Sequence, residues 1–80
     1  MDVKTAVARR ILALCAEREF AVNALANQCG MPPSTIYSIL NAKSGNPGVV
    51  SIQKICDGCE ISLREFFDDP MFDDLEQVIQ

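Results

Sequence analysis

The segment that most constrains the fold is residues 21–43, which has the pattern of two short helices joined by a tight turn. Gly30 can adopt the positive φ that lets a helix end sharply, and Pro33 suits the first position of a new helix. Apolar residues recur at helical spacing on both sides of this turn: Leu25, Ala26, Cys29, Ile36, Ile39 and Leu40. We therefore predict a helix-turn-helix whose second helix covers residues 33–42 and buries one apolar stripe.

The outer face of this second helix is expected to carry small hydrogen-bonding side chains. It would present Ser34, Thr35, Tyr37, Ser38 and Asn41 to solvent. A helix that buries one side and shows short polar groups on the other has the layout of a DNA recognition helix. An ordinary solvated helix face is the other interpretation of the same pattern.

The remainder of the chain also has helical signals. Of the 80 residues 49% are apolar and only 6% aromatic, which favours helices packed through aliphatic side chains in one small domain. Asp2 is a good cap for a first helix that runs to about Arg18, and a fourth helix ends near Cys59. Ser62, followed three residues later by Glu65, is the capping box of a short fifth helix.

The last segment, residues 71–80, is predicted to be a separate short amphipathic helix. Phe72, Leu75 and Ile79 repeat at the i, i+3, i+7 spacing of a helix face. A helix of this length is marginal on its own, so its apolar face must pack on residues 1–70 or on a second copy of the chain.

Charge is distributed unevenly along the sequence, with a net value of −4. Residues 1–45 hold five basic and three acidic side chains, whereas residues 46–80 hold two basic and eight acidic ones. The acidic part therefore lies outside the helix-turn-helix, although the weakly basic first half predicts low non-specific affinity for nucleic acid. No apolar run is long enough to span a membrane and no signal peptide is evident, so we expect a cytoplasmic protein.

Chemistry other than binding has little support in the sequence. Cys56 and Cys59 form a C-x-x-C pair, but the chain has no histidine and the pair lies on a predicted buried stripe, which favours core thiols over a zinc or redox site. Metal analysis would test that alternative. Without a phosphate-binding glycine loop, a nucleophile elbow or a carboxylate pair in a predicted cleft, no catalytic residue, metal or cofactor is expected.

With these residues placed, the chain resembles the phage-repressor (Cro/repressor-like, XRE) family of helix-turn-helix transcriptional regulators. The resemblance covers about residues 3–67 and is carried by Leu25-Ala26, Gly30, the STIYSIL run at 34–40, Asn46-Pro47 and the run IQKICDGCEISLREFF at 52–67. It implies an all-α fold: a five-helix repressor-like helix-turn-helix DNA-binding domain over residues 1–70, with a short extra C-terminal helix.

The resemblance also implies which residues would contact DNA. The base-contacting positions would be Pro33, Ser34, Thr35 and Ser38. The positions implied for the DNA backbone are Asn23, Tyr37, Asn41, Lys43, Ser44, Gly45 and Asn46. Two departures weaken the family pattern: Ala21 and Val22 replace the usual Ser or Thr and the phosphate-contacting Gln, and the recognition helix lacks side chains that form bidentate base pairs.

We therefore expect a sequence-specific transcriptional regulator, a repressor, that binds double-stranded DNA as a homodimer without a cofactor. The residues expected at the dimer interface are Phe67, Phe72, Leu75 and Ile79. The alternative is an antitoxin-like or adaptor protein-interaction module with the same fold, whose acidic half binds a basic protein partner. Neither function involves a membrane.

Overall fold

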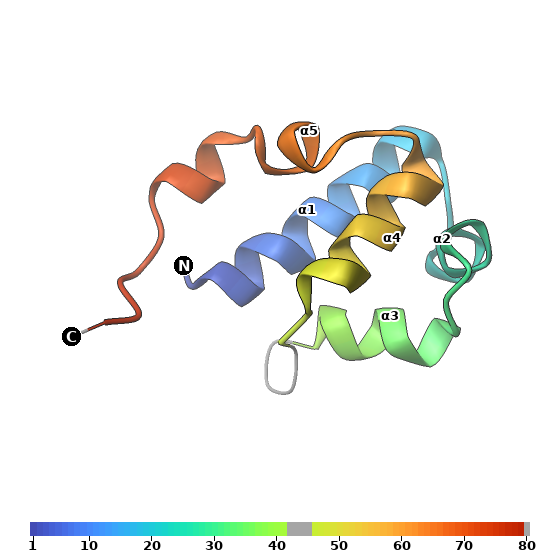
Figure 1. Cartoon of the computed structure of the whole chain (residues 1–80), viewed down its shortest axis with the longest axis horizontal. Coiled ribbons are helices and arrows are strands. Elements are labelled where there is room, and N and C mark those ends of the chain that lie inside the picture. Colours follow the sequence, from blue (N-terminus) through green and yellow to red (C-terminus); the bar gives the residue numbers. More distant parts are fainter. Residues whose placement is uncertain (42–45, 80) are drawn as a thin grey trace.

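The computed structural model describes residues 1–41 and 46–79, and every regular element within them is a helix. In chain order these are α1 (Val3–Arg18), α2 (Val22–Cys29), α3 (Pro33–Leu40), α4 (Val49–Cys59), α5 (Leu63–Phe67) and a 3₁₀ helix, η1 (Pro70–Asp73). Figure 1 shows α1 and α4 in the middle, α2 and α3 on one side, and α5 with the C-terminal segment on the other. This arrangement confirms the predicted all-α, five-helix fold.

The residues at the helix ends explain why the helices begin and end where they do. The Asp2 side chain accepts a hydrogen bond from the Thr5 backbone N–H at 2.8 Å, and Ser62 and Glu65 form the predicted capping box. Gly30 ends α2 in the left-handed region, with a φ of 66°. Ala21 caps α2 without a side-chain hydrogen bond, as its methyl group requires.

The core is formed mainly by aliphatic side chains on the inner faces of the helices. Its largest fully buried members are Phe66, Ile11, Leu14, Leu25, Ile36 and Ile55, together with the thiols of Cys56 and Cys59. The predicted core interpretation of the C-x-x-C pair is therefore confirmed. Val3 and Phe67 are each 39% exposed, and Leu40, which was predicted on the buried stripe, is half-buried.

Gly58 marks the closest approach between α2 and α4. A Cβ at this position would lie 2.5 Å from the Cys29 Sγ atom and 3.0 Å from the Cys29 Cα atom. Glycine is therefore required by the neighbouring helix, although it weakens α4 itself.

The C-terminal helix is shorter than the sequence pattern predicted. It is the single 3₁₀ turn η1, in which the Asp69 side chain accepts from the Met71 N–H at 3.0 Å, and residues 74–79 are not helical. Phe72 packs on Phe67, with ring centroids 5.0 Å apart, and the Glu76 N–H donates to the Met1 carbonyl at 3.0 Å. These contacts to the body of the domain replace the hydrogen bonds of a helix too short to form alone.

Arg10 joins the first helix to the fifth. Its Nε donates to the Phe66 carbonyl at 2.7 Å, and its Nη2 donates to the Glu65 carbonyl at 3.1 Å. Its guanidinium also lies 5.8 Å from the centroid of the Phe66 ring. The side chain thus satisfies carbonyls at the C-terminal end of α5.

Candidate nucleic-acid interface

The position of α3 follows from its two faces. Pro33 occupies the first turn, and the buried side chains of Ile36 and Ile39 hold the helix against α1 and α2. The opposite face is open to solvent, where Ser34 and Ser38 are exposed and Tyr37 is 53% exposed. The predicted outer face is therefore accessible at Ser34, Tyr37, Ser38 and Asn41, whereas Thr35 is half-buried.

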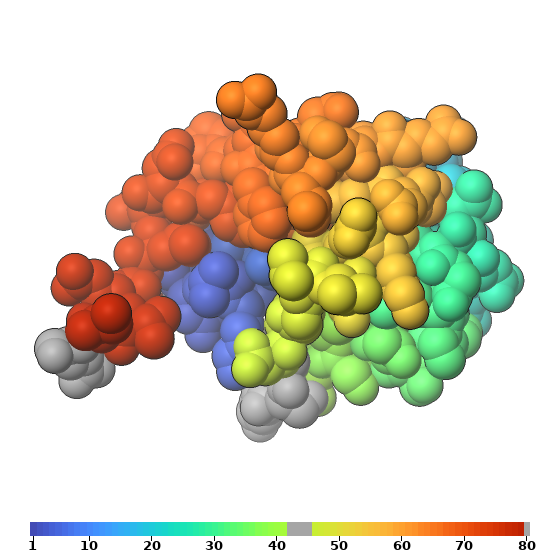
Figure 2. Space-filling view, in the orientation of Figure 1, coloured from blue at the N-terminus to red at the C-terminus, as the bar shows by residue number. Residues whose placement is uncertain are grey.

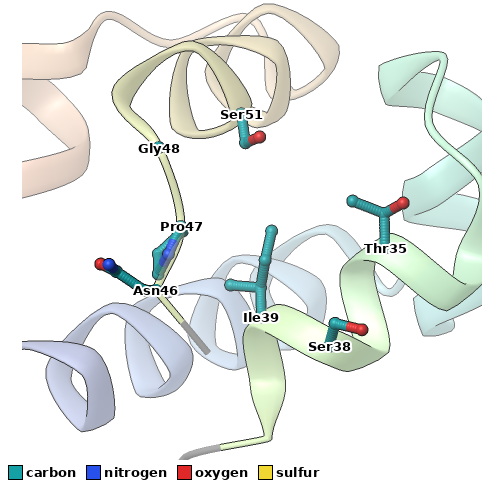
Figure 3. A pocket seen from close by; sticks show the side chains of 7 residues that line it. All are labelled: Thr35, Ser38, Ile39, Asn46, Pro47, Gly48 and Ser51. Carbon is teal, nitrogen blue, oxygen red and sulfur yellow. The ribbon is translucent and has the colours of Figure 1, made fainter. Parts of the chain in front are cut away.

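A surface hollow of about 220 Å³ lies between α3 and the start of α4. In Figure 3 it is bordered by side chains from α3 on one side and by the segment that leads into α4 on the other. Its lining residues are Thr35, Ser38, Ile39, Asn46, Pro47, Gly48 and Ser51. The hollow thus combines hydroxyl and amide groups with a backbone segment, all of which can donate or accept hydrogen bonds.

The structure brings together three of the predicted DNA-contacting residues, Thr35, Ser38 and Asn46, around this hollow. Pro33 and Ser34 lie beside it on the exposed first turn of α3. The remaining predicted positions form no part of its lining. Asn23 is exposed in the first turn of α2, and Tyr37 is on the exposed face of α3. Asn41 follows the last residue of α3, and its backbone N–H donates to the Tyr37 and Ser38 carbonyls. The predicted positions Lys43, Ser44 and Gly45 lie outside the described residues.

Ser51 is a member of the hollow that the sequence analysis did not identify. It is in the first turn of α4, and Figure 3 shows its side chain between α4 and α3. No local sequence signal could have identified it, because its place in the lining depends on how α3 and α4 are arranged in the fold.

The electrostatics of this face are unusual for a nucleic-acid interface, because residues 21–41 include no charged side chain. The acidic side chains of residues 65–76 are on α5 and the segment after it, which Figure 1 shows on the other side of α1 and α4 from α3. The hollow is therefore separated from the acidic surface that would repel phosphate.

The cysteines do not form a second site. All four are free thiols, and burial raises the pKa of each, that of Cys29 to about 11. Thiols with a raised pKa remain protonated and are poor nucleophiles at neutral pH. Within residues 1–41 and 46–79 no group of three or more His, Cys, Asp or Glu side chains is arranged to hold a metal ion. Over the same ranges, no helix combines the length and apolar character of a membrane span.

Comparison with known proteins decides the family. The family model of the Cro/C1-type HTH DNA-binding domain matches residues 10–70. The chain belongs to this family. The crystal structure of the prophage Lp1 protein 11 is similar to this Cro/C1-type domain, with a TM-score of 0.82 and 25% sequence identity over 94% of this chain and 100% of that one. No curated protein matches the chain. The expected resemblance to phage-repressor helix-turn-helix proteins is thereby confirmed, in a family that is typically non-enzymatic.

Proposed function

We propose that the chain, a DNA-binding regulator by its Cro/C1-type domain, is a repressor of transcription that inserts α3 into the major groove of double-stranded DNA. The observation that supports this proposal is the open hollow between α3 and α4, whose lining includes the hydroxyl-bearing residues Thr35, Ser38 and Ser51. A regulator of this kind acts where the DNA is, in the cytoplasm, and requires neither a catalytic residue nor a cofactor.

The proposed base contacts come from Pro33, Ser34, Thr35 and Ser38. A serine or threonine hydroxyl can donate to or accept from several base edges, and the Thr35 methyl group can contact a thymine methyl group. Because such contacts discriminate bases weakly, the specificity of one copy is expected to be low. The proposed contacts to the DNA backbone come from Asn23, Tyr37, Asn41, Lys43, Ser44, Gly45 and Asn46.

Because one copy is expected to discriminate bases weakly, we propose that a homodimer binds a palindromic operator. Two recognition helices spaced by about one turn of DNA, roughly 34 Å, would double the number of base contacts. The proposed interface contains Phe67, Phe72, Leu75 and Ile79. In the described chain Phe67 and Ile79 are exposed, whereas Phe72 and Leu75 are half-buried against the same copy.

The test is binding of the purified protein to its own upstream DNA and to a scrambled duplex, by fluorescence anisotropy at two salt concentrations. We expect preference for the upstream DNA and its loss in the S34E/S38E variant, since two carboxylates would face phosphate. Glutamate at position 34, in the first turn of α3, complements the positive end of the helix dipole, whereas position 38 is in the last turn, so circular dichroism must show that the double variant remains helical. For a matched comparison, Ser38→Glu should weaken binding, whereas Gln53→Glu on the exposed side of α4 adds the same charge and should not.

The uncharged surface of residues 21–41 supports one second candidate, the antitoxin-like or adaptor module. That function predicts no preference for any duplex among fragments of the genome selected in vitro, and co-purification with a second, basic protein. Selection of a specific duplex whose binding is abolished by S34E/S38E would rule it out as the main function.

A further inference from the structure

Apolar groups point into the hollow between α3 and the start of α4. In Figure 3 the Thr35 methyl group and the end of the Ile39 side chain are directed into it from α3, and the Pro47 ring borders it on the other side. The Thr35 hydroxyl oxygen and the Asn46 amide are directed away from it, and Ser51 adds a hydroxyl group at the α4 side. A chemical group that enters the hollow from solvent therefore contacts carbon atoms of Thr35, Ile39 and Pro47.

The chain itself does not cover these apolar groups completely. Ile39 belongs to the core and is 6% exposed, whereas Thr35 and Pro47 are half-buried. The hollow has a volume of about 220 Å³, and an apolar cavity of about 150 Å³ can hold a benzene molecule, so a methyl group fits together with the edge of the ring that carries it. In Figure 2 α3 (green) and the start of α4 (yellow) reach the surface on the same face, while the C-terminal segment (red) is at the far end of the molecule. The hollow can thus be entered from the side on which DNA is proposed to lie.

The chemistry of base edges indicates which group would enter. Each base pair presents a distinct set of groups in the major groove, and the C5-methyl group of thymine is the apolar one. The other groups are hydrogen-bond donors and acceptors, which lose free energy when they leave water without gaining a partner. Within α3 (Pro33–Leu40) no side chain can form a bidentate pair of hydrogen bonds with a base. The recognition helix therefore offers an apolar contact where other proteins offer two hydrogen bonds.

We propose that the hollow binds the C5-methyl group of a pyrimidine base in the major groove, so that the protein selects duplexes with thymine opposite Thr35. This inference rests on the proposed insertion of α3 into the major groove and names the chemical feature that is read there. 5-Methylcytosine carries the same methyl group at the same ring position. The hollow would therefore accept 5-methylcytosine in place of thymine, whereas uracil and unmodified cytosine would leave it unfilled.

Replacement of thymine by uracil tests the proposal on the DNA, because it removes the methyl group alone. A duplex is selected in vitro from random sequences with the full chain, and each of its thymines is replaced in turn by deoxyuridine. In fluorescence anisotropy we expect at least one replacement to weaken binding about fourfold for each copy of the protein bound, the effect of leaving one methyl group in water. At that position 5-methylcytosine should bind more tightly than cytosine. If every uracil duplex binds as tightly as the thymine duplex, the proposal is overturned and the DNA-binding function stands.

Two variants of Thr35 test the proposal on the protein. Thr35→Ser removes only the methyl group and should reduce the fourfold difference between thymine and uracil to about twofold, since Ile39 remains. Thr35→Val keeps a methyl group and loses the hydroxyl group, so the difference should persist. Thr5→Ser, which removes the same methyl group from α1, is the matched control and should also retain it. A difference that is lost in Thr35→Val and kept in Thr35→Ser would assign the preference to the hydroxyl group and overturn the proposal.

The outcomes distinguish this inference from the function on which it rests. If no duplex is preferred over scrambled DNA, the DNA-binding proposal fails and the methyl site fails with it. If a duplex is preferred and its thymines tolerate uracil, the methyl site alone fails. The uracil series uses the wild-type protein, so it gives this answer even if a Thr35 variant does not fold.

Discussion

At the scale of single residues, Gly58 offers the sharpest test of the packing. Alanine there would gain about 1 kcal/mol of helix propensity, but its methyl group would meet the backbone of α2 at Cys29. We expect Gly58→Ala to lower the free energy of unfolding by about 1–3 kcal/mol, as for other overpacked cores, in urea titrations. Gly48→Ala is the comparison, because a Cβ at Gly48 has no neighbour within 4 Å; its cost should be limited to the poorer N-cap that alanine gives α4. A neutral Gly58→Ala would show that α2 and α4 are further apart than described.

The thiols make a second residue-scale prediction, on pH. Burial raises the pKa of Cys29 from 9.0 to about 11, so between these values the unfolded chain loses the proton while the folded chain keeps it. Stability attributable to this thiol is therefore fully present below pH 9 and decreases as the pH rises toward 11. Urea titrations at increasing pH should show this decrease, and Cys29→Ala should make it shallower. An equally steep decrease in the variant would assign the effect to other groups.

At the scale of elements, the link between α1 and α5 depends on Arg10. Arg10→Met keeps the apolar stem but loses both hydrogen bonds to the end of α5, which should lower the free energy of unfolding by about 1–3 kcal/mol. Arg10→Lys should restore little of it, because an ammonium group lacks the planar fork of donors. Arg9→Met, at the exposed neighbouring position, should be nearly neutral. If Arg10→Lys is as stable as the wild type, the link depends on the positive charge and not on the geometry of the guanidinium hydrogen bonds.

The elements also show which parts of the structure sequence patterns can predict. α1, α2 and α5 were predictable because each has a local end signal, at Asp2, Gly30 and the Ser62–Glu65 box. The structure of the C-terminal segment was not predictable, because i, i+3, i+7 spacing also occurs in a non-helical segment whose apolar side chains contact the rest of the domain individually. The serines of α3 follow from one helix periodicity. Ser51 joins the candidate site only through the tertiary arrangement that places the start of α4 across the hollow from α3, which no local pattern encodes.

At the scale of the whole molecule, the proposed DNA-binding surface is distinguished by its lack of charge. Exposed cations among the described residues lie outside α2 and α3, and the remaining basic candidate for phosphate contact is Lys43, outside the described ranges. Affinity would then come mainly from hydrogen bonds and backbone groups, with few counterions released.

The salt dependence of operator binding measures this property directly. A dimer that neutralises about two to four phosphates should give a slope of log K against log salt of about −2 to −4, far from the value of about −10 seen for a strongly basic interface. Lys43→Gln should reduce the steepness by about two for the dimer, one unit for each copy. Arg64→Gln is the control, because α5 lies on the other side of the molecule from α3, and its slope should match the wild type. A steep slope that Lys43→Gln leaves unchanged would mean that cations outside the helix-turn-helix, on α1 or α4, contact the DNA, and that α3 is not the centre of the interface.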